Sequence, residues 1–508
     1  MSRERGGISS EDGICRRHAN DCVFELGEAG GLNFPPASLW QSVSHLMVGT
    51  GAFQVAGVIN FILLARLLDE SGFGLVRQLV LINQLIFTIL FMSLVTAMLY
   101  FAGKAADEAE RKAVIYTHIR LALMMVVPVC GLLMFAPAGV AMLLNSPGLE
   151  RLLPVFSLFP LFYIIYTFMP SVLVAAEKTE GLVRFTSVAA VLNMAPVIFV
   201  AWFTRDVAAV VATMTLAAGI TALLGLRLVA LLTRGRSRVA PGARSVFAYA
   251  GLLMLSATIT IVGRRFDQIA ISRELGVELY AIYVVGAFEI PLFSLLQSSV
   301  ASVLMPKLAA AIAIGDWCKV RCLWRDSIHK SATLMFPLAA WLLIYSEEFI
   351  TLLFGSPYVT AAPVLSLFCL LVLVRVMNFG LVLRAMGRTV FDLIGAALFT
   401  VAVFFGVRYG LHEYGMIGVA TAVVASTLLL GGGMVLATFL VSGGELSPRV
   451  IYPAGVPIYF FTSLGIIWIM KSGLTAGGAP AWLTFVVGLL VVPTLMLGIG
   501  RMSGAWAK

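Results

Sequence analysis

Two stretches of sequence decide the fold, and the first is INFILLARLLDESGFGLVRQ at residues 59–78. It contains the end of one long apolar segment, a short polar turn and the start of another apolar segment. The second stretch, RRFDQIAISRELGVELYAIY at residues 264–283, repeats this order. Both fit the pattern [AS]-R-x-L-x4-[FY]-[GA], in which Arg66 and Arg273 are 207 residues apart. The sequence therefore predicts a duplicated helical unit.

The composition of the whole chain points to a lipid environment. Of its 508 residues, 60% are hydrophobic and 12% are charged, and the mean hydropathy is +0.98. A soluble domain carries about 25% charged residues, and it could not hide so much apolar surface. The net charge of +9 does not indicate nucleic-acid binding, because the basic residues lie between apolar segments and form no stripe or tail. The sequence therefore predicts an all-α polytopic membrane protein.

Apolar segments long enough to cross a bilayer recur along the chain. A spanning helix needs roughly 20 apolar residues. The candidate segments are 43–65, 77–101, 113–136, 152–176, 185–204, 207–232, 250–272, 280–304, 328–345, 361–385, 391–410, 416–441, 450–470 and 482–500. We therefore expect about fourteen transmembrane helices. With both termini in the cytoplasm, the inner loops and helix ends hold most of the 35 Lys and Arg residues, as the positive-inside rule requires.

The duplication divides the chain into units. Residues 1–38 are polar and lack the order of a signal peptide, so we expect a flexible cytoplasmic tail. Residues 39–235 and 236–445 are predicted to form two lobes of six helices each, and residues 446–508 add two more helices. Because six is an even number, the lobes share one orientation and are related by an axis along the membrane normal. We expect these pseudo-symmetric lobes to face each other across a central cleft.

Three segments of the sequence carry a family resemblance. The stretches at 59–78 and 264–283, together with VLMPKLAAAIAIGDW at 303–317, resemble the O-antigen and exopolysaccharide flippases of bacteria. These flippases belong to the multidrug/oligosaccharidyl-lipid/polysaccharide exporter superfamily, and the resemblance covers helices one to twelve. It implies a V-shaped pair of lobes in the inner membrane and an undecaprenyl-pyrophosphate-linked glycan as substrate. It also implies polymerase and other assembly proteins as partners.

Ionisable residues inside the predicted spans are the first candidates for a site. Such a group costs at least about 2.5–3.5 kcal/mol to insert, so its default interpretation is functional. Helix seven carries Arg264, Arg265 and Asp267, and helix eight carries Glu289 and Gln297. Arg264 and Asp267 could pair at i, i+3, and Glu289 could pair with Arg265. The two arginines could instead lie near enough to the outer end to reach water.

Helices one and ten carry further polar residues. Gln54 and Asn60 are about 120° apart around helix one and do not share a face. Asn60 corresponds to Asp267 in the repeat and is the better candidate for the cleft. Arg375 and Asn378 on helix ten could line the cleft or brace the lobe. The complete predicted cleft set is Arg264, Arg265, Asp267, Glu289, Gln297, Gln54, Asn60, Arg375 and Asn378.

This residue set favours a flippase over other classes of protein. Arginine binds phosphate oxygens bidentately, so a basic cleft suits a lipid-linked pyrophosphate. An ion-coupled exporter of cationic drugs would need an acidic cleft, whereas the four mid-helix arginines, Arg120, Arg264, Arg265 and Arg375, outnumber two carboxylates. A glycan polymerase or ligase would need a large external loop, and none is predicted. The sequence has no P-loop and no HExxH motif, so we expect no catalytic residue, cofactor or metal.

Two carboxylates are also candidates for energy coupling. Asp267 or Glu289 could carry a proton or bind sodium during transport. Pairing with arginine explains both residues equally well, so the sequence leaves the coupling ion open.

Overall fold

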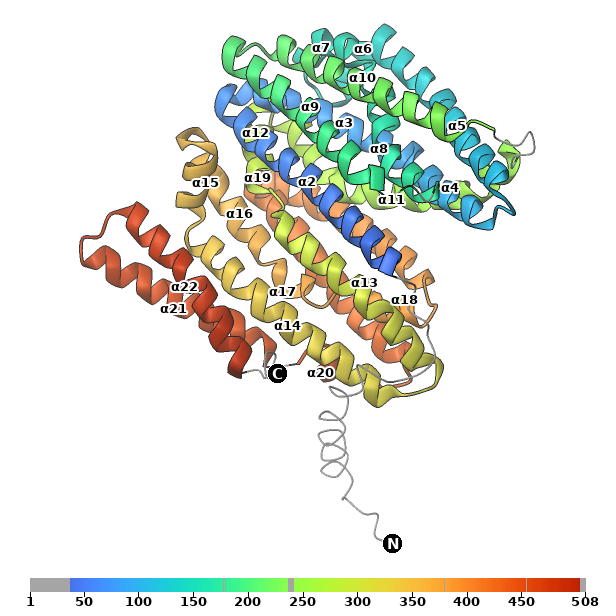
Figure 1. Cartoon of the computed structure of the whole chain (residues 1–508). Helices are drawn as coiled ribbons and strands as arrows, with labels where there is room; N and C mark the ends of the chain where they lie inside the picture. Colours follow the sequence, from blue (N-terminus) through green and yellow to red (C-terminus); the bar gives the residue numbers. More distant parts are fainter. Residues whose placement is uncertain are drawn as a thin grey trace.

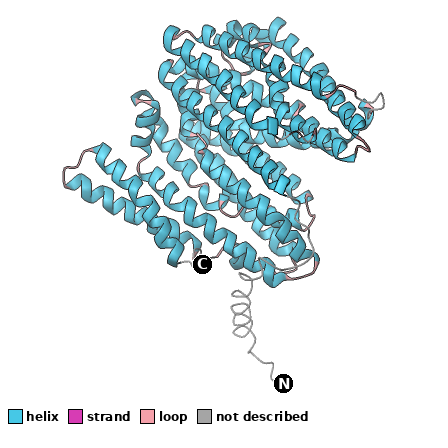
Figure 2. Cartoon of the chain, in the orientation of Figure 1, coloured by secondary structure: helices cyan, strands magenta, loops and turns pink. Residues whose placement is uncertain are grey.

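A computed structural model of the protein describes residues 37–502, except Glu177, Thr179, 236–241, Phe379 and Ala454. Every regular element in this part is a helix, and the described residues contain no strand (Figure 2). The all-α prediction is therefore confirmed. The predicted tail at residues 1–38 lies almost entirely outside the described residues.

The helices follow one another with short connections. Those of the first half are α2 Ala37–Leu67, α3 Glu70–Leu90, α4 Met92–Lys104, α5 Glu108–Phe135, α6 Pro137–Leu143, α7 Gly148–Phe156, α8 Phe159–Ala175, α9 Glu180–Thr204 and α10 Val207–Leu232. Those of the second half are α11 Ala243–Glu274, α12 Val277–Gly286, α13 Pro291–Ala313, α14 Trp317–Ile344, α15 Ser346–Phe354, η1 Ser356–Ala361, α16 Ala362–Cys369, α17 Val372–Arg375, α18 Leu381–Ala385 and α19 Val390–Val441. The C-terminal helices are α20 Pro448–Ile451, α21 Val456–Ala476 and α22 Ala481–Met502.

Helix bounds in the two halves follow a common pattern. α5 and α14 each have 28 residues, and they begin 209 residues apart at Glu108 and Trp317. α2 and α11 end 207 residues apart at Leu67 and Glu274, and another helix follows each after a short turn. The order of helices therefore repeats along the chain. The division into two lobes that move against each other stays a prediction.

The number of spans is lower than expected by the criterion of length and composition. Within the described residues, ten helices qualify as spans, or twelve if each of two bent pairs is one span. The count of fourteen is therefore not confirmed, although a multi-pass membrane protein is. Two segments account for the difference between twelve and fourteen spans. Helix α19, with 52 residues, counts as one span, and α2 is not counted because its apolar stretch Phe53–Leu67 is too short.

Helix α19 folds back on itself near its middle. A straight helix of this length would extend about 78 Å, more than twice the hydrocarbon thickness of a bilayer. Gly415 breaks the helical geometry with φ 57° and ψ −137°. A Cβ added at Gly410 would overlap the carbonyl oxygen of Gly418, so the backbones on either side of the break touch directly. Glycine permits this close approach because it has no side chain.

Most helices pack on others of the same half, while α11 and α12 of the second half also pack on α3 of the first, and α11 on α4. Figure 1 shows α3 to α10 in the upper part of the molecule and α13, α14 and α16 to α18 in the lower part. In the first half, α2 packs on α9, α9 on α10, and α10 on α8. In the second half, α11 packs along α19, and α14 packs on α13 and α16. The pair α21 and α22 packs on α14, and Lys471 Nζ of α21 lies 2.5 Å from Glu348 Oε1 of α15.

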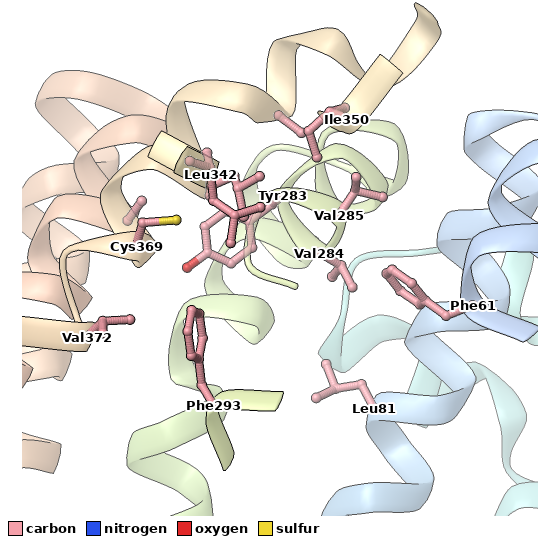
Figure 3. Close-up of a cluster of buried hydrophobic side chains, with 14 of the residues drawn as sticks. Phe61, Leu81, Tyr283, Val284, Val285, Phe293, Leu342, Ile350, Cys369 and Val372 are labelled. Carbon is pink, nitrogen blue, oxygen red and sulfur yellow. The ribbon is translucent and has the colours of Figure 1, made fainter. Parts of the chain in front are cut away.

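Aromatic side chains join the two halves near the turn between α2 and α3. Phe61 stacks on Phe288 with ring centroids 5.2 Å apart, and it meets Phe354 edge-on at 5.5 Å. Phe73 meets Tyr358 edge-on at 5.9 Å. Figure 3 shows further buried side chains around this contact, among them Leu81, Val284, Val285 and Ile350. The two halves are therefore tightly packed together at this end.

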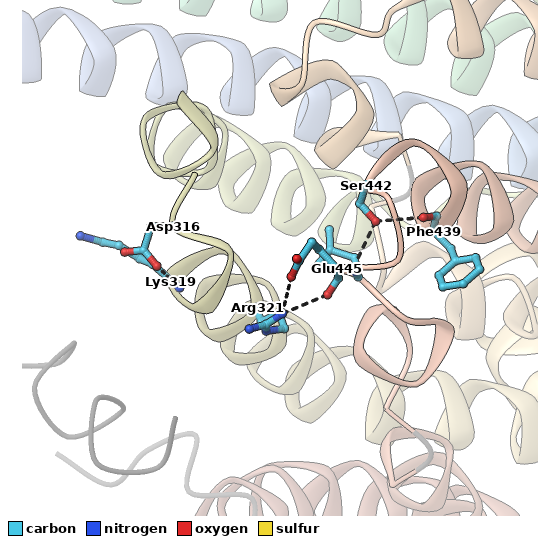
Figure 4. A network of polar contacts seen from close by, with 7 residues as sticks. Asp316, Lys319, Arg321, Phe439, Ser442 and Glu445 are labelled. Atoms are coloured by element: carbon cyan, nitrogen blue, oxygen red, sulfur yellow. Dashed lines mark hydrogen bonds and ion pairs between the residues drawn. The ribbon is translucent and has the colours of Figure 1, made fainter. Parts of the chain in front are cut away.

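Polar contacts at the start of α14 tie this helix to the end of α19. Asp316 caps α14 by accepting a hydrogen bond from the backbone N–H of Lys319 at 2.9 Å. Arg321 Nη1 donates to the carbonyl and to Oε2 of Glu445, at 3.2 and 3.0 Å (Figure 4). Ser442 Oγ donates to the carbonyl of Phe439 at 3.0 Å. These bonds fix the ends of two long helices of the second half relative to each other.

Candidate functional site

Two apolar stretches of the second half are interrupted by non-helical backbone. The first break separates α12, which ends at Gly286, from α13, which begins at Pro291. The second break separates α17, which ends at Arg375, from α18, which begins at Leu381. Irregular backbone inside a membrane is tolerated only where protein or water surrounds it, and transporters use such breaks at binding sites. The surroundings of these breaks are therefore the candidate site.

Hydrogen bonds and one ion pair connect the two breaks. Gln297 Nε2 donates to the carbonyl of Arg375 at 2.5 Å, and Asn378 Nδ2 donates to the carbonyl of Gln297 at 3.0 Å. Asn378 adopts a left-handed backbone conformation with φ 43°, which asparagine tolerates better than most residues. Arg375 Nη1 lies 2.7 Å from Glu289 Oε1. Four residues of the predicted cleft set therefore meet where the breaks face each other.

Helix α11 adds two arginines to this group. The Arg264 side chain is exposed, and its guanidinium lies within electrostatic reach of Glu289, Arg375 and Arg265. The suggested pair between Glu289 and Arg265 is wrong, because Arg375 from the second break binds that carboxylate. Sequence spacing within α11 and α13 gave no information about the approach of α17.

Asp267 lies on the buried side of α11. It is 4% exposed, and its Oδ2 accepts a hydrogen bond from the hydroxyl of Tyr283 at 2.6 Å. Its Oδ1 accepts no hydrogen bond from the described residues. The suggested pair with Arg264 does not form, because Asp267 faces α12 while Arg264 reaches the breaks. Arg265 is the arginine within electrostatic reach of Asp267.

Arg77 is a member of the site that sequence reasoning missed. It lies two turns inside α3, its guanidinium carbon is 4.7 Å from the centre of the Phe61 ring, and it is within electrostatic reach of Arg265. The sequence placed the second span at 77–101 and so treated Arg77 as a residue at a helix end. The N-cap at Asp69, whose side chain accepts from the Gly72 backbone N–H at 3.2 Å, was the signal for an earlier helix start.

The two candidates on helix one contribute less than expected. Gln54 is exposed, and Asn60 is partly buried with an Oδ1 that accepts no hydrogen bond from the described residues. Among the residues that the structure describes, no hydrogen bond connects the side chain of Gln54 or Asn60 to the breaks. Their role in a cleft stays a prediction.

The site as a whole is basic. We call Arg77, Arg264, Arg265 and Arg375 the arginine cluster; they come from α3, α11 and α17. Two carboxylates, Asp267 and Glu289, lie against it, so arginines outnumber acids by four to two. Guanidinium groups offer paired N–H donors that match phosphate or carboxylate oxygens. The arrangement is chemically suited to hold an anion with more than one charge.

A separate cavity lies at the packed end of the molecule, between the turn that joins α2 to α3 and the segment from Phe354 to Tyr358. It has a volume of about 730 Å³ and is lined by Arg66, Asp69, Glu70, Glu278 and Tyr358, among other residues. It is not the central cleft that the sequence predicts. Among the residues that the structure describes, no group of three His, Cys, Asp or Glu side chains is placed to hold a metal ion.

Comparison with known proteins identifies the family. A family model described as polysaccharide biosynthesis protein matches residues 63–363, which is more than half of the chain. The chain belongs to this family. The matched region includes α3, α11 and both residues of the Arg264–Arg265 pair, so most of the arginine cluster lies within the family's own part of the sequence. A search of curated proteins finds no match.

Solved structures show which fold this family member shares. The lipid II flippase MurJ, in an inward closed conformation, superposes with a TM-score of 0.70 at 12% identity, covering 90% of this chain and 98% of that one. An inward-facing multidrug transporter of the MATE family gives a TM-score of 0.61 at 13% identity, covering 79% of this chain and 98% of that one. A MOP superfamily transporter from Pyrococcus furiosus gives a TM-score of 0.54 at 14% identity, covering 80% of this chain and 96% of that one. The family member therefore has the fold of flippases and transporters, which are not enzymes.

Proposed function

We propose that this protein flips an undecaprenyl-pyrophosphate-linked oligosaccharide from the cytoplasmic to the outer leaflet of the bacterial inner membrane, for cell-surface polysaccharide synthesis. Membership of the polysaccharide biosynthesis family supports the pathway, and the fold shared with MurJ supports a flipping mechanism. The observation that carries the proposal is the arginine cluster beside two broken helices. In this proposal, both termini lie in the cytoplasm.

The chemistry of the cluster fits the head group of such a lipid. A pyrophosphate diester carries about two negative charges, and four arginines against two carboxylates leave about two positive charges to meet them. Arginine suits a partly buried anion site because its guanidinium is a very strong base and stays protonated in proteins. The lipid tail would remain in the bilayer while the head group crosses beside the breaks.

Contacts between the halves fit one state of an alternating-access cycle. At the end where α2 meets α3, Arg66 Nε donates to the carbonyl of Leu353 at 2.7 Å, and a second guanidinium nitrogen donates to that of Leu352. Asn145 Nδ2, also of the first half, donates to the carbonyl of Arg273 of the second half at 3.2 Å. We take this end to be the outer gate in its closed state. Rocking of the lobes would break these bonds and expose the site to the outer side.

The alternative of a drug exporter fits the charge of the site less well. A cationic drug would be repelled by the arginine cluster, whereas an anion would be attracted to it. Coupling to H⁺ or Na⁺ through Asp267 or Glu289 stays a prediction, and so does a partnership with polymerase and assembly proteins. Measuring transport by the protein in liposomes after a jump in pH or sodium concentration would identify the coupling ion.

Replacing the two arginines of α11 tests the function directly. We expect Arg264→Ala together with Arg265→Ala to reduce glycan export at least about 100-fold, since two charge-assisted contacts to phosphate would be lost. The control is Arg120→Ala with Arg151→Ala, two exposed arginines on α5 and α7, which should leave export near the wild-type level. Membrane levels and monodispersity in detergent are compared for all variants.

A conservative variant separates charge from hydrogen-bond geometry. Arg264→Lys with Arg265→Lys keeps both charges but cannot form bidentate contacts, so export should fall only part of the way. Export within twofold of the wild type in the double alanine variant, at normal membrane levels, refutes the pyrophosphate contact.

A further inference from the structure

Glu289 has an unusual position for an acidic residue. It lies in the break between α12 and α13, and its side chain is 53% exposed, although it belongs to the interrupted apolar stretch. Its Oε1 is 2.7 Å from Nη1 of Arg375, whose side chain is 25% exposed. Neither helix packing nor the N-cap of α13 uses this carboxylate, since that helix begins with Ile290 as a cap without a side-chain bond. The carboxylate is therefore directed at the arginines.

Two arginines from different helices share this carboxylate. Arg375 from α17 binds it directly, and Arg264 from α11 lies within electrostatic reach of it. A planar carboxylate with two oxygens uses the same guanidinium donors as a phosphate group. In the structure Glu289 therefore fills the role that an anionic ligand would fill between Arg264 and Arg375.

We propose that Glu289 is an internal counter-ion that competes with the substrate's phosphate for Arg264 and Arg375. The inference rests on the proposed function and assigns a role to this residue within the same site. Substrate binding displaces the carboxylate, and its return to the arginines promotes release of the head group. Glu289 thus sets how tightly the site holds its anion and keeps the empty site from carrying excess positive charge.

The surroundings of the pair suit reversible displacement. A partly exposed ion pair is weak, because water screens it and can solvate the displaced carboxylate. Arg375 keeps its place when the carboxylate leaves, since Gln297 Nε2 holds its backbone carbonyl and Asn378 holds the carbonyl of Gln297. Asp267 cannot play this part, because it is buried and bonded to the hydroxyl of Tyr283.

Binding of inorganic pyrophosphate to the purified full-length protein tests the inference. Glu289→Gln keeps the shape of the side chain but removes its charge, so we expect pyrophosphate to bind about three- to tenfold more tightly than to wild type. Glu289→Ala should change affinity in the same direction. Glu413→Gln, the same substitution at a distant site in α19, should leave affinity unchanged.

A double-mutant cycle distinguishes competition from a structural effect. If Glu289 acts through the arginines, Glu289→Gln should have no effect in a protein that also carries Arg264→Gln and Arg375→Gln. Equal affinity of wild type and Glu289→Gln, with binding that still depends on the arginines, overturns the counter-ion role and leaves the proposed function standing. Absence of pyrophosphate binding in both proteins overturns the proposed contact itself and the inference with it.

Discussion

The interrupted helix of the second half differs sharply from its counterpart in the first. In the first half, α7 and α8 form one bent span with an angle of 53° between them, and the residues after Arg151 are without charge as far as Ala175. In the second half, the corresponding stretch is divided into η1, α16, α17 and α18, and it carries Arg375 and Asn378 at its last break. The path of the chain is repeated, but the polar groups are not.

This difference indicates a division of labour between the halves. Helix packing repeats because the same apolar contacts stabilise both units: α2 packs along α9 as α11 packs along α19. Of the arginine cluster, only Arg77 comes from the first half. We therefore expect the second half to supply most of the residues that bind the anion, while the first half supplies Arg77 and the facing side of the cleft. Three paired substitutions test this comparison.

The largest difference is expected between Asp267 and its counterpart Asn60. Asp267→Ala leaves Arg265 and the Tyr283 hydroxyl without their acidic neighbour, which should cost about 3 kcal/mol of stability. Asn60→Ala removes a partly buried amide whose oxygen accepts no bond from the described residues, and it should cost less than about 1 kcal/mol. Thermal unfolding of both purified variants in detergent measures the difference.

An isosteric variant controls for the loss of volume at Asp267. Asp267→Asn keeps an acceptor for Tyr283 and should be less destabilising than Asp267→Ala. Equal losses from Asn60→Ala and Asp267→Ala would mean that the two halves use this position in the same way, against our interpretation.

A smaller difference is expected between two glycines that face the compared helices. A Cβ at Gly431 of α19 would overlap Cγ1 of Val374, next to Arg375, whereas a Cβ at Gly225 of α10 would lie 3.2 Å from Cγ of Met169. Valine is stiff and methionine is flexible, so Gly431→Ala should cost about 2 kcal/mol and Gly225→Ala less than about 1 kcal/mol.

The same pair of variants reports on the site. Because Val374 precedes Arg375, Gly431→Ala should also weaken pyrophosphate binding, and Gly225→Ala should not. If both variants unfold at the same temperature and bind pyrophosphate alike, the helix beside Arg375 is no more tightly held than its counterpart.

The smallest difference is expected at the gate, where two side chains of the first half donate hydrogen bonds to carbonyls of the second half. Arg66→Ala removes charged bonds to two carbonyls, whereas Asn145→Ala removes one neutral bond. Since both sites are exposed, we expect the gate to open about fivefold more often in the first variant and about twofold in the second. The rate at which an impermeant maleimide labels Ala65→Cys, a buried position of α2 beside the cavity at this end, measures the opening.

A reference protein without the introduced cysteine corrects this rate for labelling of native cysteines. Identical rates in wild type and Arg66→Ala would show that these bonds do not hold the gate closed.

The sequence was sufficient to predict the class of structure, and it named most of the residues that the structure brings together in the candidate site. Hydropathy reports the cost of inserting each segment into lipid, which depends on composition alone, so the helical membrane fold follows from it. The repeat predicted helix order, and the cost of charge in a membrane singled out Arg264, Arg265 and Arg375. The family resemblance predicted the transporter fold that the comparisons confirm.

Only the tertiary structure decided which groups touch. Glu289 and Arg375 are 86 residues apart and meet because two helix breaks face each other. The structure places the start of α3 at Glu70, which puts Arg77 inside the helix and beside the site. It also shows that Asp267 faces Tyr283 and not Arg264. Spacing along one helix fixes the face on which a side chain lies, but not the neighbour that this face meets. That neighbour depends on packing among distant helices, and the stabilities of alternative charge pairs differ too little for sequence spacing to rank them.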